Sequence, residues 1–298
     1  MRPLDQMWQV WNQDLLPLAK PRVVMLLVFT AFISMLLSIA PNEAMPWLKI
    51  IMGSLGIGFV ACSAAVINCL VEKQLDSKMR RTQHRALAQG RVSTAEALGF
   101  ASILLLIGLV ILLKFNNVLT VWLTLATFVG YALFYTVVLK PATPQNIVIG
   151  GLSGAMPPVL GWAAVHNAIT PESLILTLII FVWTPPHFWS LALYKKEEYK
   201  ASGLPMLPVT HGEKYTCLNI FLYTVLLTAV TLLPVSMKMC GWIYAVSVTL
   251  LNVRFMYFGW ILWRKGYEEK LARQSFWYSI WYLMLLFAAL LVDKYVAI

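Results

Sequence analysis

Three polar side chains at the end of a long apolar stretch have the types and spacing of a metal site. Asn68, Glu72 and Asp76 stand four residues apart, where the apolar stretch meets a dense run of basic residues. On a helix this spacing puts all three on one face. Carboxylate and amide oxygens bind Mg²⁺, and Mg²⁺ together with arginine binds diphosphate. The pattern therefore predicts a lipid diphosphate as substrate, and carboxylates that are simply solvated at a membrane boundary are the alternative.

Asn68 and the basic run favour a bound ligand over solvated carboxylates. Asn68 lies about one turn inside the apolar segment, where an amide is costly unless it has a partner. Arg81 and Arg85 follow within the basic run. We predict that Asn68, Glu72 and Asp76 bind Mg²⁺, and that the two arginines bind the diphosphate.

A histidine within another apolar stretch is a second candidate for chemistry. His187 follows Pro185 and Pro186 and lies between Trp183 and Trp189. A lone histidine on an apolar helix is commonly a core residue that is satisfied by hydrogen bonds. The double proline interrupts the helical hydrogen-bond ladder, and with the aromatic rings it favours a position in a cavity. We expect His187 to contact a substrate there.

The charged residues near these stretches have two interpretations each. Lys195 and Lys196 either mark the cytoplasmic side or bind diphosphate, and Glu198 either lies on a loop face or completes a metal site. Lys140, alone in a short loop, either fixes the topology or reaches a diphosphate oxygen. Arg254 lies within an apolar stretch, roughly 15 Å from its cytoplasmic end at the rise of a helix. It either extends toward the membrane surface or faces a cavity and pairs with an acidic group.

Transmembrane helices must position these residues. The chain has 298 residues, of which 60% are hydrophobic and only 12% charged, too apolar for a soluble domain of this length. A spanning helix needs roughly 20 apolar residues. We expect nine such helices, over residues 23–40, 50–71, 97–113, 115–139, part of 141–170, 173–194, 215–237, 239–263 and 274–292. The sequence therefore predicts an all-α polytopic membrane protein whose residues 1–298 form a single membrane domain.

The distribution of charge indicates an orientation in the membrane. If the N-terminus is cytoplasmic, most of the 23 lysines and arginines fall on the cytoplasmic side, which is the positive-inside pattern. The net charge of +10 then reflects topology and anionic lipid, and it does not indicate a nucleic acid partner. Residues 1–20 become a cytoplasmic N-terminal segment and the C-terminus becomes periplasmic. The long loops 72–95 and 195–215 are cytoplasmic, and long loops tend to carry function.

The N-terminal residues indicate how the chain enters its membrane and which membrane that is, and the cysteines bear on redox and haem chemistry. The first twenty residues lack an apolar core with a small-residue cleavage site, so we expect the first helix to stay as a signal anchor. The absence of an Arg/Ser-rich transit peptide favours a bacterial inner membrane over an organelle. The four cysteines are scattered without a C-x-x-C or C-x-x-C-H motif, so neither a thiol redox pair nor covalently attached c-type haem is indicated.

Four motifs resemble one enzyme family. The pattern N-x-x-x-E-x-x-x-D-x-x-M-x-R-T-x-x-R, at residues 68–85, resembles the first aspartate-rich motif of the UbiA-type intramembrane prenyltransferases. Residues 143–151, 183–189 and 203–209 are similar to the branch of that family that farnesylates protohaem IX, the haem O synthases. The resemblance covers roughly residues 20–292, and the joint occurrence of the motifs is more specific than any one of them.

The resemblance implies a fold, a reaction and a set of site residues. Members of this family have nine helices around a central cavity that opens to the cytoplasmic side. They ionise a prenyl diphosphate with Mg²⁺, and the haem branch transfers farnesyl from farnesyl diphosphate to a vinyl group of haem B, giving haem O. Haem A synthase or a terminal oxidase assembly are the protein partners implied. The residues expected to contact haem or the prenyl chain are Tyr135, Asn146, Trp183, Trp189 and Arg254.

The chain departs from the family pattern at three points, and two other functions are alternatives. Glu72 replaces the usual aspartate, Pro141 stands where arginine is common, and the second loop has no D-x-x-x-D. A UbiA-type enzyme with an aromatic or chlorin acceptor should show that D-x-x-x-D. A haem or lipid transporter without catalysis would not need the acidic face that Asn68 begins.

Overall fold

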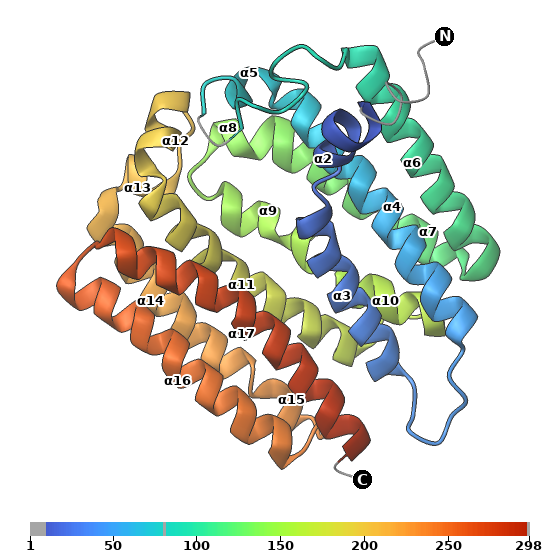
Figure 1. Cartoon of the computed structure of the whole chain (residues 1–298). Helices are drawn as coiled ribbons and strands as arrows, with labels where there is room; N and C mark the ends of the chain where they lie inside the picture. Colours follow the sequence, from blue (N-terminus) through green and yellow to red (C-terminus); the bar gives the residue numbers. More distant parts are fainter. Residues whose placement is uncertain (1–9, 80–81, 297–298) are drawn as a thin grey trace.

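The computed structural model describes residues 10–79 and 82–296 (Figure 1). All regular structure in this part of the chain is helical, without a strand. The elements are η1 (Val10–Leu15), α2 (Leu16–Leu18), α3 (Pro21–Ser38), α4 (Trp47–Val71), α5 (Lys73–Asp76), α6 (Thr94–Phe115), α7 (Val118–Val129), η2 (Gly130–Leu139), α8 (Lys140–Ala142), α9 (Asn146–Ala155), α10 (Pro157–His166), α11 (Pro171–Tyr194), α12 (Lys196–Ser202), α13 (Leu207–Thr210), α14 (Gly212–Val230), α15 (Leu233–Ser236), α16 (Trp242–Lys265) and α17 (Glu269–Val296).

Within the described residues, nine helical segments are long and apolar enough to cross a membrane. Six are the single helices α3, α4, α6, α11, α16 and α17. The other three are composite, because α7, η2 and α8 follow one another, α9 leads into α10, and α14 leads into α15. This confirms the prediction of an all-α polytopic membrane protein. The central cavity stays a prediction.

Local sequence signals explain where several helices begin. Ser93 and Glu96 form a reciprocal capping box at the start of α6, and Thr170 and Ser173 form another at the start of α11. Between α9 and α10, Met156 is followed by Pro157 and Pro158, which supply no backbone N–H to continue the ladder. In contrast, α11 runs through Pro185 and Pro186 without an interruption.

The bundle has two differently built ends (Figure 1). The short helices α5, α8, α12 and α13 lie at one end, which we call the site end. The loop 39–46, α15 and the C-terminal part of α17 lie at the opposite end. In the sequence-based orientation, the site end corresponds to the cytoplasmic side.

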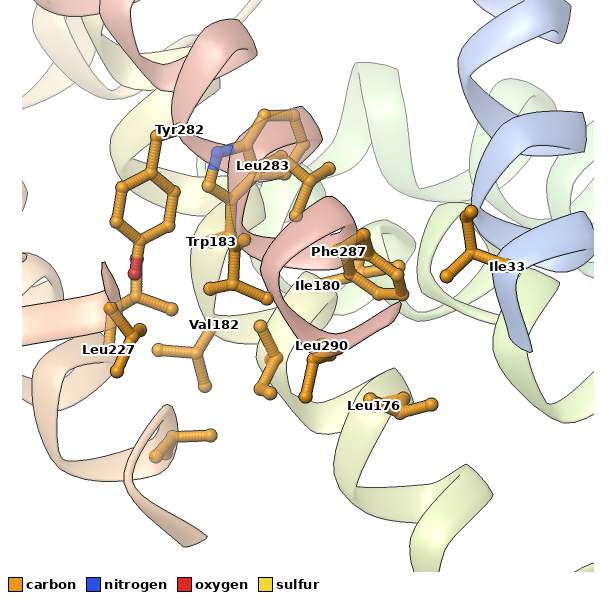
Figure 2. Close-up of a cluster of buried hydrophobic side chains, with 14 of the residues drawn as sticks. Ile33, Leu176, Ile180, Val182, Trp183, Leu227, Tyr282, Leu283, Phe287 and Leu290 are labelled. Atoms are coloured by element: carbon orange, nitrogen blue, oxygen red, sulfur yellow. The ribbon is translucent and has the colours of Figure 1, made fainter. Parts of the chain in front are cut away.

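The largest apolar core joins helices from both halves of the chain (Figure 2). Helix α11 contributes Ile180 and Trp183, α17 contributes Leu283 and Phe287, and α3 contributes Ile33. Because α11 packs against α9, α10, α14 and α17, it lies between the N-terminal and C-terminal groups of helices (Figure 1). Residues on α11 are therefore held on several sides by packed helices.

A glycine sets how closely α10 approaches α3, and we expect Gly161→Ala to destabilise the bundle. A Cβ atom at Gly161 would lie 2.3 Å from the backbone oxygen of Ala31, which cannot move aside as a side chain can. Overpacking of this kind typically costs about 1–3 kcal/mol. The matched control is Gly99→Ala, because no atom lies within 4 Å of a Cβ there and the change should add up to about 1 kcal/mol of helix propensity. Thermal unfolding followed by circular dichroism in detergent checks this, and equal melting temperatures for the two variants would contradict it.

Candidate functional site

The predicted metal-binding face forms where α4 passes into α5. The backbone N–H of Glu72 donates to the backbone carbonyl oxygen of Asn68 at 3.0 Å. The backbone N–H of Asp76 donates to the backbone carbonyl oxygen of Glu72 at 2.8 Å. This helical bonding keeps the three side chains on one face although α4 ends at Val71. Asn68, Glu72 and Asp76 are 2%, 6% and 4% exposed. The acidic face therefore points into the protein and not into lipid or solvent.

Each of these buried side chains has a cationic partner. Lys140 Nζ lies 2.5 Å from Glu72 Oε1, and Arg85 Nη1 lies 2.6 Å from Asp76 Oδ2. Lys20 Nζ donates to Asn68 Oδ1. Three cations thus meet two carboxylates, which leaves a formal surplus of positive charge.

Lys20 was missed as a site residue by the sequence analysis, which treated it only as a cytoplasmic charge. Its backbone is left-handed, with φ 49° and ψ 55°, and Pro21 begins α3 directly after it. A non-glycine residue in this conformation is uncommon and often marks a functional position. The turn directs the Lys20 side chain from the start of the first span to the end of the second. Nothing in the sequence pattern signals this backbone conformation.

The π-helix η2 brings its own polar groups to the acidic face. Asn68 Nδ2 donates to Glu72 Oε1 at 2.8 Å and to Thr136 Oγ1 at 3.1 Å. Thr136 Oγ1 in turn donates to the backbone carbonyl oxygen of Tyr131, five residues earlier, at 2.8 Å. π-Helical turns are rare and frequent at functional sites. Here Thr136 and Lys140, four residues apart, both contact the acidic face.

The electrostatics of Glu72 reflect its partners. Burial alone would raise the pKa of this carboxyl, but the charges of Lys140 and Lys20 outweigh burial and hold the pKa below its ordinary value. Burial lowers the pKa of Lys20, and the neighbouring cations Arg85 and Lys140 lower it further, against the opposing charge of Glu72. Glu72 is therefore an ionised carboxylate at neutral pH.

The donor set fits Mg²⁺ when a substrate shares the coordination. Mg²⁺ prefers hard oxygen ligands, and proteins usually hold it with one or two carboxylates while substrate phosphates and water complete the sphere. Asn68, Glu72 and Asp76 supply two carboxylates and an amide oxygen, all buried. The described residues contain no group of three or more His, Cys, Asp or Glu side chains placed to hold a metal alone.

His187 lies in a tightly ordered setting on α11. Its ring stacks between Trp183, at 4.3 Å between centroids, and Phe276, at 4.7 Å. His187 Nδ1 lies 2.6 Å from Ser279 Oγ, and that hydroxyl donates to the Phe276 oxygen at 2.6 Å. With the Ser279 hydroxyl proton directed at the Phe276 oxygen, the tautomer that fits is the one in which Nδ1 carries the proton and donates to Ser279. A neutral His187 then has its lone pair on Nε2.

Among the other predicted substrate contacts, Trp183, Trp189 and Asn146 are buried and Tyr135 is half-buried. Trp183 donates its indole N–H to the backbone carbonyl oxygen of Ser279 at 2.8 Å. Trp189 is 1% exposed and belongs to an apolar cluster, with its indole nitrogen unpartnered. Asn146 Nδ2 donates to the Thr143 oxygen at 2.6 Å, while its Oδ1 is buried without a partner. The Tyr135 ring lies against Gly150, where a Cβ would approach it to 2.1 Å.

The second charged segment forms its own ion pairs. Lys195 Nζ lies 2.8 Å from Glu198 Oε1, and Lys196 Nζ lies 2.9 Å from Glu213 Oε1. These residues, with Lys78, line a pocket of about 550 Å³ at the site end. No described contact joins Glu198 to the acidic face, so its role as a metal ligand stays a prediction.

Arg254 does not join the acidic face in the described structure. Arg254 is exposed, and its guanidinium lies over the Tyr278 ring at 5.1 Å. This position is on the outer surface of the bundle, not toward an acidic group, so the geometry does not support a cavity-facing Arg254. Arg81, predicted to bind diphosphate, lies outside the described residues.

Comparison with known proteins identifies the family. Residues 27–281 match the UbiA prenyltransferase family. This chain belongs to that family. A protoheme IX farnesyltransferase of Leptothrix cholodnii is 56% identical over 286 residues, covering 96% of this chain and 93% of the relative. One from Thiobacillus denitrificans is 57% identical, covering 95% of this chain and 94% of the relative.

Solved structures of UbiA proteins share the fold. A digeranylgeranylglyceryl phosphate synthase superimposes with a TM-score of 0.77 at 21% identity, covering 94% of this chain and 97% of the other. A UbiA homologue from Archaeoglobus fulgidus bound to DMAPP and Mg²⁺ gives a TM-score of 0.61 at 17% identity, covering 92% and 98%. At these identities the comparison shows a shared fold.

We expect acid to weaken this protein partly through Glu72. Because its folded-state pKa lies below the ordinary 4.5, ionised Glu72 stabilises the fold above that pH. This contribution is lost as the pH falls through the folded-state value. The melting temperature of the wild type should therefore fall more steeply between about pH 5 and 3 than that of Glu72→Gln. A Glu197→Gln variant, at an exposed position, is the control and should follow the wild-type slope. Parallel slopes for the wild type and Glu72→Gln would contradict the assignment.

The contact between His187 and Ser279 gives another expected outcome. Ser279→Ala removes the acceptor of a buried Nδ1–H and should lower the free energy of unfolding by about 1–3 kcal/mol. Ser275→Ala is the matched control, one turn earlier on α17. It removes a 3.1 Å contact with Ser190, whose hydroxyl also donates to the Pro186 backbone oxygen. Chemical unfolding in detergent measures both, and an equal loss would argue against the Ser279 hydroxyl as the anchor.

Proposed function

We propose that this chain transfers a farnesyl group from farnesyl diphosphate to a vinyl group of haem B, giving haem O, with Mg²⁺ as its cofactor. The observation that carries the proposal is the buried face of Asn68, Glu72 and Asp76, in direct contact with three cations, in a member of a prenyltransferase family. The names of the relatives, at 56–57% identity over nearly the whole chain, supply the farnesyl donor and the haem acceptor.

The cations supply the diphosphate site in this proposal. A lysine ammonium has three N–H donors and a guanidinium has five, so Lys140 and Arg85 can keep their carboxylates and still donate to phosphate oxygens. Lys20 adds a third cation from the start of α3. Arg81, Lys195 and Lys196 are further proposed diphosphate contacts, and the latter two line the pocket at the site end.

Asn68, Glu72 and Asp76 would hold Mg²⁺ against the diphosphate, with Glu198 as a proposed further ligand. Bound there, Mg²⁺ would supply Lewis-acid stabilisation of the diphosphate leaving group. The network Asn68–Glu72–Thr136 fixes the orientation of the amide and of one carboxylate before substrate arrives. Such preorganisation reduces the cost of ordering the site during the reaction.

Water must be kept from the allylic cation that forms when the diphosphate leaves. The apolar helices around the acidic face exclude water, and an aromatic face stabilises a nearby cation by about 1–2 kcal/mol when it is desolvated. Tyr135 lies on η2, which supplies Thr136 and is followed directly by Lys140, so we assign it this role.

The acceptor side of the proposal rests on α9 and α11. His187 is held with a free Nε2, and Asn146 has a buried amide oxygen without a partner, so both can bind a polar group of haem or substrate. The rings of Trp183 and Trp189 are proposed as walls for the haem or the prenyl chain. Arg254, on the outer surface of the bundle, is assigned no contact with haem or the prenyl chain.

The orientation of the chain in its membrane follows from the charge pattern. We propose that residues 1–298 form one membrane domain in a bacterial inner membrane, with the N-terminus and the site end cytoplasmic and the C-terminus periplasmic. Haem propionates would then prefer the basic cytoplasmic rim. Haem A synthase or a terminal oxidase assembly are proposed recipients of the product.

The decisive test is product formation by an Asp76→Asn variant. Purified protein is incubated with farnesyl diphosphate, haem B and Mg²⁺, and the product mass is read. We expect Asp76→Asn to lose at least about 100-fold in turnover, the scale of losing one electrostatic contact to a transition state. Asp14→Asn is the matched control, because Asp14 pairs with Arg91 at 3.0 Å and has no described contact with the acidic face, so it should keep wild-type turnover.

The same assay separates the alternatives. Chelating Mg²⁺ should stop the wild-type reaction, and adding it back should restore it. Turnover of Asp76→Asn at the wild-type rate would remove the metal assignment. Prenylation of an aromatic or chlorin acceptor in place of haem would indicate another branch of the family. Haem binding with no product would indicate a transporter.

A further inference from the structure

Arg254 lies at mid-depth on the outer surface of the bundle. Helix α16 spans Trp242–Lys265, so Arg254 is roughly 17 Å from either end at about 1.5 Å per residue. The residue is exposed, and arginine stays protonated in proteins. A charge at this depth in a spanning helix is costly and usually marks a function.

The guanidinium is held at this depth by its own neighbour. It lies 5.1 Å above the Tyr278 ring, and Tyr278 OH donates to the Leu251 oxygen at 2.9 Å, which fixes the ring against α16. Tyr278 itself is roughly 14 Å along α17 from Glu269. The stack therefore keeps Arg254 away from the membrane surface. The distance from Arg254 to either end of α16 exceeds the reach of an arginine side chain.

Arg254 has no acidic partner in the part of the chain that the structure describes. None of the ion pairs there includes Arg254. A second copy of the chain could not supply one at this depth either. The acidic residues inside the nine spans all lie within four residues of a span end: Glu96, Glu172, Glu213, Glu269 and Asp293.

The surface around Arg254 has the form of a helix-packing face. Leu250, Val253 and Tyr257 are exposed by 68%, 57% and 58%, and they follow one another at spacings of three and four residues. Such spacing gives one continuous stripe along a helix, and in this case the stripe passes beside Arg254. Lipid alone would account for the apolar stripe but not for the cation.

We propose that this stripe of α16 is the docking surface for a transmembrane helix of a different protein, one that carries a carboxylic acid at mid-membrane depth opposite Arg254. Charge complementarity selects the partner, and the apolar residues supply the packing surface. The proposal does not depend on the prenyl donor or acceptor, so the docking and the enzymatic activity can fail separately.

A synthetic transmembrane peptide tests this with the full chain in phosphatidylcholine bilayers. The probe is a leucine–alanine helix with one central glutamate and a dansyl label, and its pair has leucine in place of the glutamate. Energy transfer from the tryptophans of the chain to dansyl measures association. We expect the glutamate peptide to bind about tenfold more tightly than the leucine peptide, the scale of one interhelical polar contact in a membrane.

Arg254→Leu should remove this tenfold preference. Arg264→Leu is the matched control and should keep it, because Arg264 is also an arginine of α16 stacked on an aromatic ring, at 5.5 Å from the Trp260 centroid, but near the helix end. Equal binding of the two peptides, or a preference that persists in Arg254→Leu, would overturn the proposal. Loss of the preference on adding phosphatidylglycerol would assign Arg254 to a lipid phosphate and would overturn it as well.

Discussion

Two carboxylates buried at the edge of a membrane require cations beside them, and the arrangement of the site end follows from this requirement. Removing an ionised carboxylate from water costs several kcal/mol unless close partners compensate. Glu72 and Asp76 obtain these partners from Lys140 and Arg85. Since Lys140 follows η2 and Arg85 lies in the loop after α5, the fourth span and that loop must both converge on the end of α4.

This constraint also makes the site responsive to a ligand. A carboxylate neutralised only by lysine and arginine has lone pairs left for a metal, and the cations have N–H groups left for phosphate. Opposite charges held together in a buried place thus prepare a surface that recognises a metal and an anion at the same time.

Much of the fold could be predicted from the sequence because long apolar runs have one structural solution in a membrane. The nine spans agree with the predicted stretches to within a few residues at most ends, and the i, i+4, i+8 face of Asn68 survives the end of α4. The contacts of Lys20, Thr136 and Ser279 could not be predicted, because they depend on a left-handed turn, a π-helix and the packing of α17 on α11. Arg254 takes neither of the two positions predicted for it, because packing on Tyr278 holds it at mid-depth on the outer surface of the bundle.

The bond from Lys20 to Asn68 joins the start of the first span to the end of the second. A spanning helix adjusts to a thicker or thinner bilayer by tilting or kinking. Any such movement of α3 would pull on the amide that orients Glu72. A change in the lipid composition of the host membrane would therefore act on the acidic face through α3 and Lys20, without a soluble effector.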